Sequence, residues 1–283
     1  MPSYLRVSLP VLLCAVFVAN LRASDLKAVE NQSKMEFHGK TLLMSHYYVN
    51  NKLHFDASGA LVGQSEEGTW PTNGLVHVDD VELKSNVVHL HGTREILTLR
   101  TQDGKLGLQP ILLTKHMDID LEAASPISSL DDVRKTVGSV FHEENYGRKM
   151  NEYWHGLAKV TAVDPKSGKM TFEGGVDGVY GYLGERPVYF QSAGVEPPKA
   201  THKEETDYTR AAAVKRTQGR TFMLVVINEK GYPEFLHLIK DLGDDLDVQS
   251  LAGTSQWRFR PAMKDGKPVA CVIRVSWEFT SLY

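Results

Sequence analysis

Cysteine is nearly absent from this sequence. Only Cys14 and Cys271 occur among 283 residues. Cys14 lies in an N-terminal segment that we predict to be removed, so no internal disulfide can form. Cys271 shares the apolar side of the last predicted strand, a position typical of a buried and unreactive thiol. An intermolecular disulfide through Cys271 is the alternative.

The sequence also lacks an apolar run of membrane-spanning length. Arg6 precedes an apolar stretch from Val7 to Ala19, which is shorter than the roughly 20 residues that a spanning helix needs. A basic start, a short apolar core and a small residue near its end are typical of a secretory signal peptide. We therefore predict a secreted protein whose signal peptide is cleaved after Ala23. An uncleaved N-terminal anchor is the alternative.

Neither charge sign dominates. The formal net charge is −3, with 24% charged and 42% hydrophobic residues, which is ordinary globular composition. A nucleic-acid-binding protein needs a basic patch or stripe, so this balance argues against nucleic acid as the partner. The length allows two domains of average size.

Catalytic motifs are missing as well. The sequence has no Gly-x-Ser-x-Gly nucleophile turn and no His-Glu-x-x-His zinc motif. With no catalytic constellation and no cofactor motif, we predict a protein that is not an enzyme and carries no cofactor.

What is present is β-strand patterning. Residues 35–112 carry short strand-like runs separated by turn signals such as Ser58-Gly59 and Asp103-Gly104, which favour a sandwich, a barrel or a curved sheet. Ser128 or Ser129 can cap a following helix whose apolar residues include Val133 and Val137, so this helix is expected to cover the sheet. A short helical piece is expected over 149–157, followed by a hairpin that turns at 165–168.

Pro197-Pro198 and the polar residues around it indicate a linker. We predict a signal peptide over 1–23, a β-rich domain over 24–195 and a smaller domain over 196–283. The smaller domain should have the order helix–β–β–helix–β. Its second helix is expected over 242–256 with Asp244 or Asp245 at its start, and its final hairpin turns at Asp265-Gly266. The fold class is α+β.

Histidines give one hypothesis about a binding site. His54, His77, His89 and His91 each alternate with apolar neighbours, so all four take the polar side of their strands. If these strands are adjacent, three imidazoles could bind zinc or copper. The simpler interpretation is a set of solvent-facing histidines on a half-exposed sheet.

Aromatic residues give a second hypothesis about a binding site. They could line a carbohydrate or peptide groove, but core filling and strand propensity are the simpler explanation: Tyr180, Tyr182, Tyr189 and Phe190.

The C-terminal third carries a more specific pattern. A tyrosine precedes an alanine helix, one glycine precedes the first strand and another lies in the hairpin, and a Trp-Arg-Phe-x-Pro-Ala run leads into the last strand. These marks are Tyr208, Ala211–Ala213, Gly219, Gly231, Leu246-Asp247, Trp257–Phe259, Pro261-Ala262 and Gly266–Val269. Over about residues 200–283 the sequence resembles the C-terminal domain of TonB-family proteins.

The resemblance implies a small periplasmic α+β domain. Domains of this family bind outer-membrane receptors by pairing an exposed last strand with an extended receptor peptide. An open sheet edge offers unpaired N–H and C=O groups that an added strand satisfies. The candidate binding residues are those on the polar side of the last strand: Val272, Arg274, Ser276 and Glu278.

These observations predict a periplasmic adaptor that docks to an envelope partner through an open last strand. A transducer that passes force from the inner membrane is less favoured, because about 170 β-rich residues stand where such proteins carry a Pro-rich spacer. A carrier that holds a small apolar ligand or a metal in the N-terminal sheet is the other alternative. If the last strand proves fully covered, the adaptor hypothesis loses its mechanism.

Overall fold

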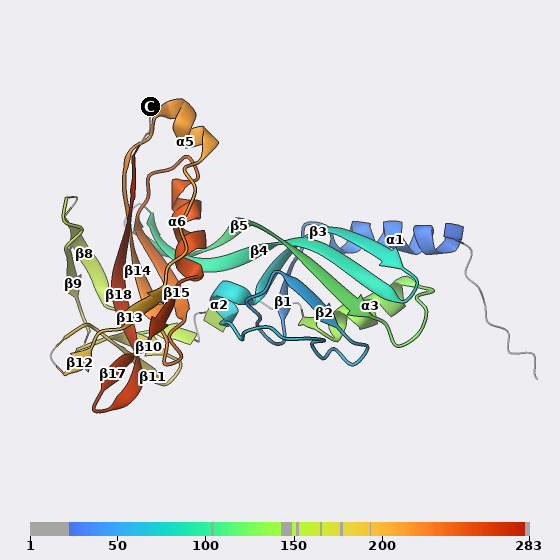
Figure 1. The fold of residues 1–283 in the computed structure, drawn as a ribbon, viewed down its shortest axis with the longest axis horizontal. Coiled ribbons are helices and arrows are strands. Elements are labelled where there is room, and N and C mark those ends of the chain that lie inside the picture. Colours follow the sequence, from blue (N-terminus) through green and yellow to red (C-terminus); the bar gives the residue numbers. More distant parts are fainter. Residues whose placement is uncertain are drawn as a thin grey trace, which may run out of the picture.

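The computed structural model describes residues 23–102, 105–142, 149–150, 153–164, 166–175, 178–192 and 194–280. The predicted signal segment, apart from its last residue, and Cys14 lie outside these ranges. Among the described residues no helix has the length and apolar character to cross a membrane. The protein mixes a few helices with many strands (Figure 1), which confirms the α+β class.

The N-terminal half is a curved sheet with two helices on one face. Its elements are α1 (Ala23–Phe37), β1 (Thr41–Met44), β2 (Lys52–Phe55), α2 (Trp70–Asn73), β3 (Leu75–Lys84), β4 (Val87–Gln102), β5 (Lys105–Glu122), α3 (Leu130–Gly138) and β6 (Phe141–His142). Strands β3, β4 and β5 are neighbours in antiparallel order, with β1 and β2 at the two sides. The sequence patterns indicated the strands but not α1, whose apolar periodicity is weak.

Helices α1 and α3 pack on the same face of this sheet. Val29 of α1 and Val133 of α3 share one buried cluster with sheet residues such as Val81 and Leu90. The predicted start of α3 is confirmed, because Ser129 accepts from the backbone N–H of Asp132 while the Asp132 carboxylate accepts from the backbone N–H of Ser129.

The middle of the chain supplies short strands. They are β7 (Trp154–His155), β8 (Lys159–Val163), β9 (Met170–Glu173), β10 (Val179–Leu183), β11 (Arg186–Tyr189), β12 (Val195–Glu196) and β13 (Lys199–His202). The hairpin expected around 165–168 is β8–β9. Residues 149–150 and 153 are helical, as expected, but Trp154 and His155 within the predicted helical piece form a strand, because they pair with β10. The segment predicted as a linker contributes β12 and β13, which pair with β17 and β16.

The C-terminal part follows the expected order of elements. They are α5 (Arg210–Lys215), β14 (Gly219–Ile227), β15 (Pro233–Lys240), α6 (Leu246–Ser255), β16 (Arg258–Arg260), β17 (Ala262–Lys264) and β18 (Lys267–Phe279). The prediction that the second helix extends back to 242 is wrong, whereas Asp245, one of the two residues predicted at its start, is its N-cap residue. Gly243, Asp244 and Asp245 all have positive φ, which right-handed helix excludes, so α6 begins at Leu246.

One sheet runs through the whole molecule. Its path is β6-β1-β3-β4-β15-β14-β18-β11-β10-β7 among the described strands. The long β4–β5 hairpin reaches from the N-terminal sheet to the C-terminal part (Figure 1), where Thr98 of β4 pairs with Leu236 of β15 in parallel. The Thr98 hydroxyl donates to the Leu236 carbonyl at 2.8 Å in a buried position. The outer edge of β15 is therefore occupied by the protein's own chain.

Both faces of the C-terminal sheet are buried over much of their area. On one face, Met223 and Val225 pack with Leu251 of α6. On the other, Leu224 and Phe235 share a cluster that includes residues of β7, β10 and β11. Residues before 196, which we call the N-terminal region, thus cover the face that α6 leaves free.

Candidate functional site: the open edge of the last strand

Strand β18 is the longest strand of the C-terminal part, and its neighbours change along its length. Lys267–Val269 pair with β17, and Ala270 and Cys271 pair in parallel with Val188 and Tyr189 of β11. From Val272 to Phe279, β14 is the one strand that the described residues place beside β18. No backbone hydrogen bond from a described loop reaches this segment either. We call Val272–Phe279 the open segment.

The requirement for an uncovered last strand is therefore met over part of its length. Cys271 has a strand on each side, β11 and β14, and Ala270 pairs with β11, whereas the eight residues that follow pair with β14 alone among the described residues. An extended peptide of that length can form a regular ladder on such an edge.

The open segment is held rigidly from one face. Trp277 donates from Nε1 to Thr254 Oγ1 of α6 at 2.8 Å, and its ring centroid lies 5.3 Å from that of Trp257. Val275 is buried in the same cluster. Because these side chains fix the strand on α6, its free edge is preorganised and a partner strand does not have to order it.

The four predicted binding residues share the opposite face, as expected. Arg274, Ser276 and Glu278 are exposed, whereas Val272 is 4% exposed and packs in the core between the sheet and the N-terminal region. Glu278 is paired with Arg220 of β14 at 2.9 Å. Arg274 makes no ion pair with a described residue.

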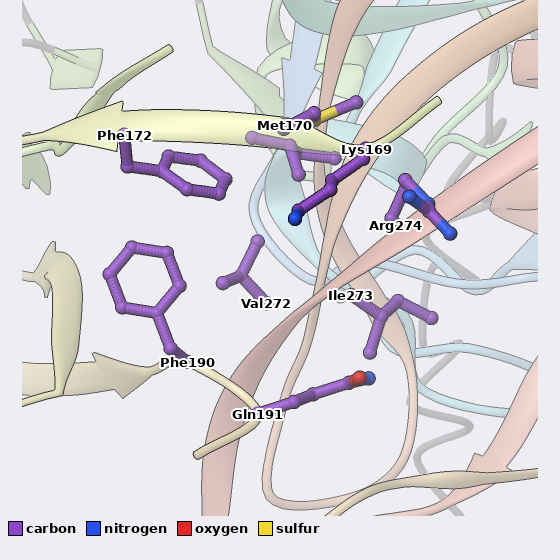
Figure 2. A pocket seen from close by; sticks show the side chains of 9 residues that line it. Lys169, Met170, Phe172, Phe190, Gln191, Val272, Ile273 and Arg274 are labelled. Carbon is purple, nitrogen blue, oxygen red and sulfur yellow. The ribbon is translucent and has the colours of Figure 1, made fainter. Parts of the chain in front are cut away.

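A pocket of about 310 Å³ lies at the start of the open segment. Figure 2 shows Val272 at its centre, with Phe172 of β9 and Phe190 on one side and Arg274 on the other. The rings of Phe172 and Phe190 meet edge to face, with centroids 4.9 Å apart. Lys169 and Met170 close the pocket from above.

Sequence reasoning found only part of this pocket. Phe190 belongs to the aromatic set proposed for a groove and does line it, whereas Tyr180 is buried beneath and Tyr182 stacks on His155 at 5.3 Å. Phe172 and Met170 were missed. Their alternation in the β8–β9 hairpin was the available signal, but it does not reveal what the hairpin packs against.

The candidate metal-binding histidines lie on the polar face of the N-terminal sheet, where three of them face carboxylates. His89 Nδ1 lies 2.6 Å from Asp120, His91 Nδ1 lies 3.0 Å from Asp118, and His54 Nε2 lies 2.8 Å from Glu122. His77 stands apart, with Nδ1 3.5 Å from the Thr41 hydroxyl. Among the described residues no group of three or more possible ligands is arranged to hold a metal ion.

Cys271 is a free, buried thiol at the covered end of β18. Burial raises its pKa to about 12, because the thiolate would lose its hydration there. The thiol therefore stays protonated and unreactive at neutral pH.

The geometry of residues 208–279 defines a class of protein domain: a small α+β unit whose last strand presents a free edge. Residues 204–281 match the family described as Gram-negative bacterial TonB protein C-terminal, and this region is a TonB-family C-terminal domain. Such a domain is a non-enzymatic interaction domain, and it indicates a TonB-like protein of the bacterial envelope. Most of the pocket wall, including Phe172 and Phe190, lies outside the matched residues.

Among solved structures, the chain is similar to the solution NMR structure of the Pseudomonas aeruginosa TonB C-terminal domain. The two share 20% identity, the match covers 33% of this chain and 92% of that one, and the TM-score is 0.27. No curated protein matches the chain.

Proposed function

We propose that this protein is a periplasmic adaptor that docks to an outer-membrane receptor by adding a receptor strand to β18. The observation that carries the proposal is the open segment, Val272–Phe279, which has one strand partner among the described residues. Removal of residues 1–23 as a signal peptide is part of this proposal.

The joined sheet favours an adaptor over a force-transmitting role. β4 pairs with β15 and β11 pairs with β18, so the C-terminal domain is tied to the N-terminal region at both sides of its sheet. A domain held in this way presents its free edge in a fixed orientation. The carrier alternative receives no such support, because the side chains of α1 and α3 fill the apolar face of the N-terminal sheet.

Photo-crosslinking tests the proposal in intact envelopes. A benzoylphenylalanine in place of Ser276 lies on the open segment and is expected to crosslink to an extended segment of an outer-membrane receptor, identified by mass spectrometry. The same probe in place of Pro268 is the matched control, because Pro268 is exposed on the same strand but lies outside the open segment, where β18 pairs with β17 instead of β14.

Amide hydrogen exchange tests whether the crosslinked receptor segment binds by strand addition. The captured receptor segment, added as a synthetic peptide, should slow amide hydrogen exchange over 272–279 and leave 267–271 unchanged. Equal crosslinking at both positions, or a peptide that binds without protecting 272–279, contradicts the proposal.

A further inference from the structure

The pocket beside the open segment begins where β11 leaves β18. β11 pairs with Ala270 and Cys271 through Val188 and Tyr189, and Phe190 and Gln191 then turn away. An added strand that continues the line of β11 therefore starts beside Val272, at the pocket (Figure 2).

The pleat of the sheet decides which partner side chains enter. Val188 lies opposite Ala270, and both belong to the cluster on the pocket face, whereas Tyr189 and Cys271 lie on the other face. Because side chains alternate along a strand, partner residues opposite Val272 and Arg274 both point to the pocket face. These two partner residues are two positions apart.

The surroundings of those two positions differ in chemistry. Opposite Val272 the wall is apolar, made by Phe172, Phe190 and Met170. Opposite Arg274 it is cationic, since Arg274 is exposed and has no carboxylate within ion-pair distance among the described residues. Lys169, equally exposed and without such a carboxylate, adds a second positive charge to the pocket and reaches toward Phe172 and Val272 (Figure 2). Arg220, the next cation on β14, is already paired with Glu278.

We infer that the pocket selects the sequence of the added strand: a bulky apolar residue opposite Val272 and a carboxylate two positions away, opposite Arg274. This inference rests on the proposed strand addition and names its partner as an extended peptide with apolar and acidic residues spaced by one. The selecting side chains Phe172, Phe190 and Lys169 come from outside the TonB-like domain, so the N-terminal region sets the specificity of an edge that the domain supplies.

Fluorescence anisotropy with synthetic peptides tests the inference on the full chain. The probes are fluorescein-labelled twelve-residue peptides of alternating Thr and Val with a central Leu-x-Asp or Asp-x-Leu, one order for each strand direction. Matched versions replace Leu with Ala or Asp with Lys. We expect one of the two peptides, Leu-x-Asp or Asp-x-Leu, to bind about tenfold or more tightly than the matched peptides with Ala or Lys. Each replacement removes either one well-packed apolar group or one ion pair, which typically costs a factor of this size.

Charge reversal provides the matched protein variants. Arg274→Glu should reverse the preference so that the Lys version binds more tightly than the Asp version. Lys267→Glu, at an exposed cation of the same strand outside the open segment, should leave the preference unchanged. Phe172→Ala should reduce the preference for Leu over Ala, and circular dichroism at each assay temperature confirms that the variant is folded.

The outcomes separate this inference from the proposed function. Equal binding of all peptides, with 272–279 protected from exchange, overturns the selection while strand addition stands. Binding of none of them contradicts strand addition itself. A fatty acid, laurate, is added as a competitor. If laurate binds stoichiometrically and displaces the Leu/Asp peptides from wild type but not from Phe172→Ala, the pocket is a lipid site and the selection is overturned.

Discussion

His237 is a buried base at the junction between the C-terminal sheet and the N-terminal region. Its Nδ1 lies 3.4 Å from the Tyr180 hydroxyl, while its Nε2 has no hydrogen-bond partner among the described residues. Burial lowers the pKa of His237 to about 4, because the imidazolium would lose its hydration. His237 is therefore neutral in the folded state.

Acid should weaken the protein through this residue. A folded-state pKa below the unfolded value of about 6.5 means that the unfolded chain binds the proton first, so the stability contributed by neutral His237 is lost as pH falls from 6.5 towards 4. The loss is on the order of 3 kcal/mol over that window. His237→Gln should show a smaller fall in the free energy of unfolding between pH 7 and pH 4.5, measured by urea titration.

His202→Gln is the control, since His202 is exposed and its carboxylate contact within the described residues is with Glu204 at 3.4 Å. If wild type and His237→Gln lose the same stability over this pH range, another group governs the acid transition.

At the scale of elements, the first hairpin of the TonB-like domain depends on Gly231. This residue has φ of +87°, and a Cβ placed on it would lie 1.9 Å from the Phe259 carbonyl oxygen of β16. Phe259 in turn donates its N–H to the Gly231 carbonyl at 2.9 Å. The glycine thus allows the β14–β15 turn to pack directly on the strand that follows α6.

Two alanine substitutions separate the effect of the contact with Phe259 on stability from the effect of the positive φ. Gly266 also has positive φ, +73°, but a Cβ there meets nothing within 4 Å. Gly266→Ala should cost about 1 kcal/mol for the left-handed conformation alone. Gly231→Ala should cost at least about 3 kcal/mol, because β16 must also move. Chemical denaturation of both variants measures the difference, and equal losses would show that the contact with Phe259 is unimportant.

At the scale of the whole molecule, the TonB-like domain is completed by the N-terminal region. β4 covers the edge of β15, and a cluster that includes Trp154 and Tyr180 covers the face that carries Leu224 and Phe235. Trp154 lies 4.5 Å from Phe235 between ring centroids. Removal of residues before 196 therefore exposes a strand edge and an apolar face together.

We expect the isolated fragment 196–283 to self-associate more strongly than the full chain, because unpaired edges and contiguous apolar surface promote association. Sedimentation velocity over a concentration series measures this. Phe235→Ser in the fragment should reduce the association by breaking the apolar face. A fragment that stays monomeric at the concentrations of the assay contradicts the expectation.

Local patterns were sufficient for much of the C-terminal part. The Trp257–Phe259 run, the Asp265-Gly266 turn and the alternation of β18 depend on neighbouring residues, and all were placed correctly. The same holds for the Ser129 cap of α3. The start of α6 was misplaced, because the sequence does not display the positive φ values of Asp244 and Asp245.

The sequence by itself determined the α+β class, the TonB-like domain at its C-terminal end and the face of β18 that carries Arg274, Ser276 and Glu278, because turns and alternation are properties of adjacent residues. Only the tertiary structure decided which part of β18 remains open and what surrounds it. β11 and the β8–β9 hairpin reach that edge from about 80 to 110 positions away in the chain. Such pairings depend on how distant surfaces fit together, and no local pattern encodes them.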